Sequence, residues 1–194
     1  MVEKGLVVIL PLVFLGSFIS RNLIVKSKIK QNVRASDGLL KASMGFSTLG
    51  IFMTIFAVWS DGFYSALGKI DVLRSPAVSV FGLCLYGVGI VMGWIFSAHL
   101  KDSWRVGVPS GQKTELVETG IYGYIRNPYF LSYYLMFISL FLVRPCYGIG
   151  AVTLACILTF HGMVLKEEIH LLESHGEAYR AYQKKAGRYF PRLG

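Results

Sequence analysis

Five apolar blocks constrain the fold of this chain more than any other feature of its sequence. No Asp, Glu, Lys or Arg occurs within residues 5–20, 42–60, 75–100, 127–143 or 145–165. A helix needs about 20 apolar residues to cross a hydrocarbon core of about 30 Å, a length that three blocks reach and the first and fourth do not. The hydrophobic content of 54% is too high for a soluble domain of this size. We therefore expect an all-α integral membrane protein with about five transmembrane helices.

The last two blocks predict a tight helical hairpin, because they are joined only by Arg144 and by Pro145, the first residue of the last block. Pro128 favours a helix start at the beginning of the first of these two helices. In the tail that follows, Gly176 predicts a break between one helix and a second short helix. We expect residues 1–100 to form a three-helix membrane anchor. Residues 101–194 then form a catalytic region of loop, hairpin and tail, within one folding unit.

The net charge of +9 follows membrane topology. Cations gather in segment 21–34 after the first block and again after the last block, as the positive-inside rule predicts for cytoplasmic segments. We expect 21–34 to be a basic loop on anionic headgroups, and the C-terminus and the cofactor site to be cytoplasmic. This distribution disfavours a nucleic-acid partner.

Metal catalysis is disfavoured as well. Glu167 and His170 have the i, i+3 spacing of di-iron bundles, but that motif has to occur twice with further carboxylates. The three cysteines show neither paired nor metal-binding spacing. The sequence therefore predicts no metal site.

Segment 118–134 has the composition of a binding site where the chain meets the bilayer. Its tyrosines combine flat faces with hydroxyl groups, and Arg126 offers a fork for a carboxylate or a phosphate. Backbone donors stay free at the helix start next to Pro128. Glu167 and Glu168 follow the hairpin, so they return to the end at which segment 118–134 lies. A carboxylate there could accept hydrogen bonds from a ribose or attract a cation.

These residues carry a resemblance to a known family. GIYGYIRNPYF, followed after the hairpin by EEIHLLESHGEAYRAYQKKAGRYFP, resembles the isoprenylcysteine carboxyl methyltransferase family, which belongs to a wider group with the phospholipid N-methyltransferases. The resemblance covers residues 114–191. Asn127 stands where the family has histidine, and Phe130 follows Tyr129 where the family has its tyrosine.

The resemblance implies methyl transfer from S-adenosylmethionine to the carboxylate of a prenylated cysteine, or a similar lipidic carboxylate, that enters from the bilayer. A carboxylate is already ionised at neutral pH, so alignment matters more than a strong base. The family's carboxylate-holding arginine falls at Met163. Arg126 and Arg188 are therefore the candidates for that role, with Glu168 as a further catalytic residue. The predicted cofactor-binding residues are His99, Thr114, Glu115, Leu116, Val117, Gly120, Tyr122, Asn127, Pro128, Tyr129, Phe130 and Glu167.

Three alternatives remain at this point. An enzyme of the same class could methylate the amine of a phospholipid or another lipid, which requires a base such as Glu168 or Tyr129. Sterol-type reductases share a similar C-terminal pattern but use NADPH and usually have more crossings. A membrane scaffold without activity is the third alternative.

Overall fold

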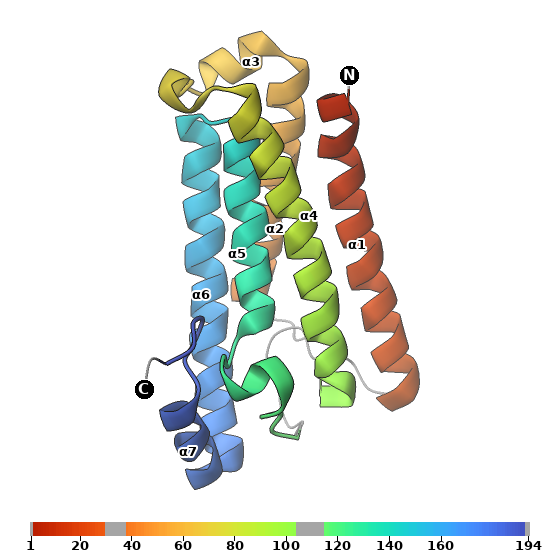
Figure 1. Ribbon diagram of the computed structural model, residues 1–194, viewed down its shortest axis with the longest axis vertical. Helices are drawn as coiled ribbons and strands as arrows, with labels where there is room; N and C mark the ends of the chain where they lie inside the picture. The colour runs from red at the N-terminus through yellow and green to blue at the C-terminus, as the bar shows by residue number, and fades with distance from the viewer. Residues whose placement is uncertain (1, 30–37, 104–114, 193–194) are drawn as a thin grey trace.

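The computed structural model describes residues 2–29, 38–103 and 115–192, and its apolar segments are helical. Five long helices lie side by side and alternate in direction (Figure 1): α1 (Val2–Ile29), α2 (Gly38–Trp59), α4 (Pro76–His99), α5 (Pro128–Val143) and α6 (Tyr147–His175). All but α5 are long and apolar enough to cross a membrane. The 16 residues of α5 extend over only about 24 Å. The all-α membrane fold is confirmed, with four full-length candidate spans and one shorter helix in the hairpin.

The first helix extends further than the sequence prediction. Helix α1 continues through Ile29, so the first part of the predicted basic loop 21–34 is helical. Arg21 donates a hydrogen bond of 2.7 Å to the carbonyl of Lys101, in the short helix η2 (Lys101–Ser103). Neither proline nor glycine interrupts residues 21–29, so nothing local ends the helix after the apolar block. The rest of the predicted loop lies outside the described residues.

The glycines of α4 bring it close to α5. A Cβ atom at Gly82 or Gly89 would lie 3.1 Å from a backbone carbonyl oxygen of α5, and one at Gly93 would lie 3.0 Å from the hydroxyl of Ser132. Small residues allow helices in lipid to approach in this way. The close packing fixes α5 against α4. It thereby also positions the polar segment that precedes α5.

The hairpin and the tail have the predicted boundaries. Pro128 is the first residue of α5, and Arg144 and Pro145 lie in the turn before α6. Helix α6 ends at His175; the next residue, Gly176, has a φ of 55°, and α7 (Glu177–Lys185) begins directly after it. A positive φ costs glycine little, which is why the direction changes here.

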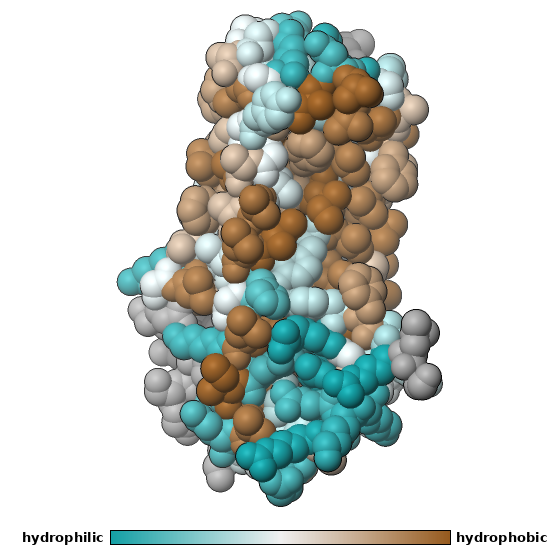
Figure 2. All heavy atoms as spheres, turned by 90° about the vertical axis from the view of Figure 1, so that its left-hand side faces the viewer, coloured by the Kyte–Doolittle hydropathy of each residue, from teal (hydrophilic) through white to brown (hydrophobic). Residues whose placement is uncertain are grey.

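Short elements close the two ends of the bundle. Helix α3 (Asp61–Ala66) and the 3₁₀ helix η1 (Asp71–Leu73) cover the end with the hairpin turn. The 3₁₀ helix η3 (Gly120–Gly123), α7 and the C-terminal residues lie at the other end. Figure 2 shows apolar side chains along the middle of one face and hydrophilic side chains gathered mainly at the α7 end. The predicted site therefore lies at a polar end of a membrane-embedded bundle.

Candidate functional site

One cavity of about 500 Å³ connects the apolar interior of the bundle with its polar α7 end. Its apolar part lies between α1 and α2, and the hairpin forms the opposite wall. The apolar wall includes Pro11, Phe14, Phe18, Met44, Ile51, Phe52, Ile55, Tyr133, Phe160 and Met163. Residues from both halves of the sequence thus form a single space.

The polar part of the cavity contains most of the residues that the sequence predicted. Eight of the predicted cofactor-binding residues line it, together with the predicted catalytic residue Arg126: Glu115, Leu116, Val117, Tyr122, Asn127, Tyr129, Phe130 and Glu167. They come from the segment before α5, from the first turns of α5 and from the later turns of α6. The hairpin brings them together because the start of α5 and the later turns of α6 lie at the same end (Figure 1).

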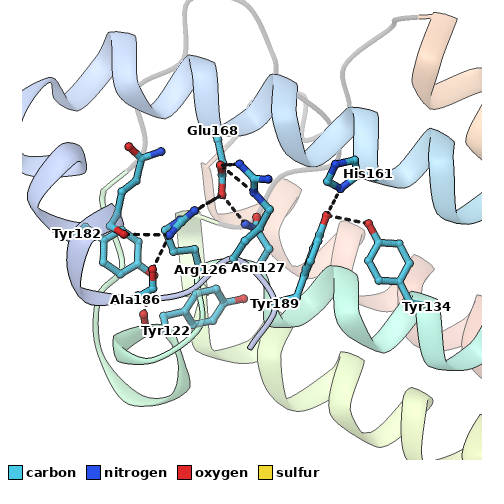
Figure 3. A network of polar contacts seen from close by, with 11 residues as sticks. Tyr122, Arg126, Asn127, Tyr134, His161, Glu168, Tyr182, Ala186 and Tyr189 are labelled. Atoms are coloured by element: carbon cyan, nitrogen blue, oxygen red, sulfur yellow. Dashed lines mark hydrogen bonds and ion pairs between the residues drawn. The ribbon is translucent and has the colours of Figure 1, made fainter. Parts of the chain in front are cut away.

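Glu168 is the centre of a buried ion-pair network (Figure 3). Its Oε1 accepts hydrogen bonds from Arg126 Nη2 at 3.0 Å, from Arg126 Nε at 3.1 Å and from Asn127 Nδ2 at 3.0 Å. Its Oε2 accepts from Arg188 Nη2 at 2.8 Å and Nε at 3.1 Å. The Glu168 residue is only 5% exposed, so these donors replace the water that a carboxylate otherwise requires.

The two consecutive glutamates have different surroundings. Glu167 lines the cavity, whereas Glu168 does not and is held by two arginines and an amide. Consecutive residues of an α-helix point about 100° apart, so one can face the cavity while the other faces the tail. Glu167 is therefore the carboxylate that a bound ligand can reach.

The C-terminal tail holds the segment before α5 in place. The N–H groups of Arg126 and Asn127 donate to the carbonyls of Gly187 and Arg188 at 2.8 and 3.0 Å, and the N–H of Gly187 donates to Tyr124 at 3.0 Å. A Cβ atom at Gly187 would overlap the carbonyl oxygen of Phe190, so only glycine fits this bend. The tail is thus part of the support for the site.

Arg126 has few donors left for a ligand. Besides its two bonds to Glu168, its Nη1 donates to the carbonyls of Gln183 and Ala186. A guanidinium group has five N–H donors, so at most one is uncommitted. Arg188 is bound to Glu168 as well, and it does not line the cavity. The two predicted carboxylate-holding arginines are therefore brought together, but around an internal carboxylate.

Three other predicted cofactor-binding residues do not line the cavity among the described residues. His99 lies beside Gly120, where a Cβ atom would overlap its Nε2; Gly120 has a φ of 60°, which favours glycine. Pro128 is buried at the start of α5. Thr114 lies outside the described residues.

Sequence reasoning missed Tyr182 and the apolar wall on α1 and α2. Tyr182 lines the cavity, and its hydroxyl donates to the carbonyl of Tyr122 at 2.6 Å. Burial raises the pKa of both phenols, so both hydroxyls remain protonated at neutral pH. The i, i+3 spacing of Tyr179 and Tyr182 is compatible with one face of a helix, but it does not show what that face contacts. The apolar residues of α1 and α2 carry no signal that distinguishes a cavity wall from a lipid-facing surface.

Comparison with known proteins identifies the family. The model of the phospholipid methyltransferase family matches residues 77–178, which is more than half of the chain. The chain belongs to the phospholipid methyltransferase family. The description of this family points to methyl transfer at a membrane. The matched residues include α4, η3, the hairpin and the two glutamates, so the family region contains most of the polar cavity wall.

A solved structure of a membrane methyltransferase has a similar fold. It is the eukaryotic intramembrane Ras methyltransferase ICMT (isoprenylcysteine carboxyl methyltransferase). The two chains are 24% identical with a TM-score of 0.57, and the similarity covers 77% of this chain and 52% of the other. The chain thus spans about half the length of that relative, and the likeness concerns the fold. A comparison with curated proteins finds no match.

The polar half of the cavity offers groups that could bind an organic ligand. Asn127 and Glu167 offer an amide and a carboxylate to hydroxyl and amino groups, and Tyr122, Tyr129 and Tyr182 add aromatic surface. Within the described residues, no three of the His, Cys, Asp and Glu side chains are close enough to hold a metal ion. The available groups fit an organic cofactor with hydroxyl, amino and cationic groups.

Proposed function

We propose that this protein transfers a methyl group from S-adenosylmethionine to a polar group carried by a lipid in the bilayer. The observation that carries this proposal is the continuity of the cavity, in which a polar wall at Glu167 and Asn127 meets an apolar groove between α1 and α2. A water-soluble donor and a membrane-embedded acceptor need such a junction. A soluble acceptor would not need the groove.

The polar wall can hold the methyl donor through this chain's own groups. S-adenosylmethionine supplies an electrophilic methyl group on a positively charged sulfur when it is bound. Glu115 and Glu167 provide carboxyl groups, and Tyr122, Tyr129 and Tyr182 provide faces on which a cation or an adenine can stack. Asn127 provides an amide that Glu168 already orients. These residues can bind the methyl donor and align its methyl group with the acceptor. Methyl transfer mainly requires this alignment of the two reacting groups.

The groove can hold the lipid acceptor. Several of its lining side chains are also exposed on the outer surface, among them Leu12 at 60% and Phe52 at 55%. The inner wall is buried, with Tyr133 at 7% and Met163 at 5%. A lining that is exposed on one side and buried on the other indicates a cavity that opens between α1 and α2, on the lipid-facing surface. We propose that the acceptor enters there.

The charges in the described lining favour an amine as the acceptor. Glu115, Arg126 and Glu167 are the charged residues in that lining, and Arg126 is ion-paired with Glu168. An acidic wall attracts an ammonium group. Glu167 can accept the proton that the nitrogen has to lose, and the freed lone pair then takes the methyl group. Glu168 is committed to two arginines, and Tyr129 shares a 2.7 Å hydrogen bond with Tyr133, which favours Glu167 as the base.

The carboxylate of a prenylated cysteine is the second candidate. The sequence resemblance supports it, and Arg126 in the cavity wall is the group that would hold it. For this role Arg126 would have to give up one of its bonds to Glu168 or to the tail. The amine candidate requires no such exchange.

Methyl incorporation in lipid nanodiscs tests the proposal. Purified protein is given S-adenosylmethionine with a radioactive methyl group, together with either phosphatidylethanolamine or S-farnesylcysteine. We expect label in the phospholipid that resists alkaline hydrolysis, because an N-methyl bond survives base and a methyl ester does not. Base-labile label in farnesylcysteine would select the second candidate. Label in neither acceptor, with no binding of S-adenosylhomocysteine, would contradict the proposed function.

Domain roles and sidedness extend the proposal. We propose that residues 1–100 supply the groove in addition to the anchor, and that residues 101–194 supply the polar wall. We also propose that the α7 end faces the cytoplasm. In a Cys84→Ser background, a membrane-impermeant thiol reagent should label Arg192→Cys from the cytoplasmic side and Val72→Cys from the opposite side. The reverse pattern would place the site outside.

A further inference from the structure

Tyr189 connects the two helices of the hairpin through its hydroxyl group. The oxygen lies 2.9 Å from Tyr134 Oη on α5 and 2.7 Å from His161 Nδ1 on α6 (Figure 3). The Tyr189 ring also packs against both partners, with centroid separations of 5.3 and 5.9 Å. None of these three side chains lines the cavity, so the proposed reaction does not account for them.

The chemistry of Tyr189 suits a bridge between two elements. Burial raises the pKa of its phenol, so the hydroxyl keeps its proton at neutral pH. A protonated phenol can donate one hydrogen bond and accept another, which matches one partner on each helix. The next residue, Phe190, is 71% exposed. The tail therefore leaves the protein interior directly after Tyr189.

The neighbouring residue connects this bridge to the site. Arg188 holds Glu168 through two hydrogen bonds, and its carbonyl accepts from the backbone N–H of Asn127. The Arg188 side chain is 38% exposed, so water competes for its guanidinium group. A fixed backbone at residue 189 reduces the freedom of Arg188 to exchange Glu168 for water. The anchoring of Tyr189 thus stabilises both the ion pair of Arg188 with Glu168 and the hydrogen bond of its carbonyl with Asn127.

Asn127 is the last link to the cavity. Its Nδ2 donates to Glu168 Oε1 at 3.0 Å, while the residue lines the polar wall. An ionised carboxylate only accepts hydrogen bonds, so Glu168 selects the orientation in which the amide nitrogen faces it. The amide oxygen and the second N–H then remain for a ligand. A displaced Glu168 would leave the orientation of this amide unspecified.

We infer that Tyr189 is a positioning residue for the cofactor end of the cavity. Its two hydrogen bonds hold the tail so that Arg188 and Glu168 keep the Asn127 amide in one orientation. This inference rests on the proposed function, because it requires that a bound cofactor contacts Asn127. It gives Tyr189 and His161 a role in cofactor binding, although neither side chain lines the cavity.

Calorimetric titration of the full chain with S-adenosylhomocysteine tests the inference. Tyr189→Phe keeps the ring and removes the hydroxyl, and we expect it to bind about fivefold to tenfold more weakly than the wild type. Phe190→Ala, at the exposed neighbouring position, is the matched control and should bind as the wild type does. His161→Phe should weaken binding too. The double variant Tyr189→Phe with His161→Phe should lose no more than Tyr189→Phe alone, because both remove the same contact.

Thermal unfolding of the same variants separates positioning from stability. A lower melting temperature of Tyr189→Phe with wild-type affinity would overturn the inference and leave Tyr189 as a tail anchor alone. Tyr134→Phe serves if Tyr189→Phe does not fold, since it keeps the bond to His161. Wild-type affinity in a folded Tyr134→Phe would overturn the inference equally. Absence of binding in the wild type would instead contradict the proposed function, which is a distinguishable result.

Discussion

Each end of the bundle has a cluster of cationic side chains and a short segment paired with the chain next to the hairpin. The two ends differ in what their cations contact. At the α3 end, Lys69, Arg74 and Arg144 lie 5.4, 5.9 and 5.4 Å from the centre of the Tyr64 ring. At the α7 end, Arg126 and Arg188 enclose a buried carboxylate. A short segment pairs with the polypeptide next to the hairpin at both ends, through the bridges Lys69–Cys146 and Ile125–Gly187.

The comparison shows that a cluster of cations is not sufficient to mark a site. Tyr64 is fully buried, and its hydroxyl donates to the carbonyl of Pro145 at 2.9 Å. Tyr64 and the three cations around its ring therefore form a closed cap at the α3 end. Neither Tyr64 nor its three cations line the cavity. At the α7 end, one member of the ion-pair network, Arg126, and its neighbour Asn127 line the cavity. Contact with an accessible cavity distinguishes the candidate site from the cap.

The largest expected effect comes from Glu168→Ala. This change leaves Arg126 buried without its carboxylate, and breaking a buried ion pair in this way costs about 3–5 kcal/mol of stability. Arg188 is partly exposed and adds less. Thermal unfolding in detergent and titration with S-adenosylhomocysteine should both show a loss. A melting temperature equal to that of the wild type would mean that the ion-pair network contributes no stability.

Glu167→Ala should separate binding from stability at the same end. Glu167 lines the cavity, so we expect affinity for S-adenosylhomocysteine to fall by about tenfold or more, as for loss of a charged hydrogen-bond partner, with little change in melting temperature. Glu173→Ala, at an exposed position on the same helix, is the matched control. Equal affinity in the two variants would remove Glu167 from the site.

Tyr64→Phe tests the cap at the other end. It removes the hydrogen bond to Pro145 and leaves the carbonyl without that donor, at a cost of about 1 kcal/mol of stability. Methyl transfer should continue at the wild-type rate once the protein is folded, because the cap lies at the opposite end from the polar wall. A selective loss of methyl transfer without a loss of stability would show that the two ends are coupled.

Lys69→Ala should have the smallest effect. It removes one of three cations from the Tyr64 ring, and a cation–π contact contributes about 0.5–1 kcal/mol at a site with some exposure. Thermal unfolding should show a small decrease, and S-adenosylhomocysteine affinity should not change. A decrease as large as that of Glu168→Ala would mean that the cations of the cap are as important to the fold as the buried ion pairs.

Several elements could be predicted because their signals are local. Pro128 fixes a helix start by its own φ angle and its missing N–H, and Gly176 permits a left-handed turn at a helix end. The adjacency of Glu167 to the segment before α5 followed from hairpin connectivity, which requires both ends of the hairpin to meet. The sequence prediction placed the end of the first helix too early, at the end of the apolar block. Charged residues after the block can continue a helix, and α1 runs on to Ile29.

The membrane-embedded helical bundle, the hairpin and most of the polar residues at the α7 end could be predicted from the sequence, because apolar length, proline, glycine and chain connectivity act within short stretches. The folded chain was needed to show that Glu167 faces the cavity, that Arg126 is already paired, and that Tyr189 joins α5 to α6. These outcomes depend on contacts between residues far apart in the chain. Their geometry follows from packing and from the requirement that buried charges and hydroxyls find partners.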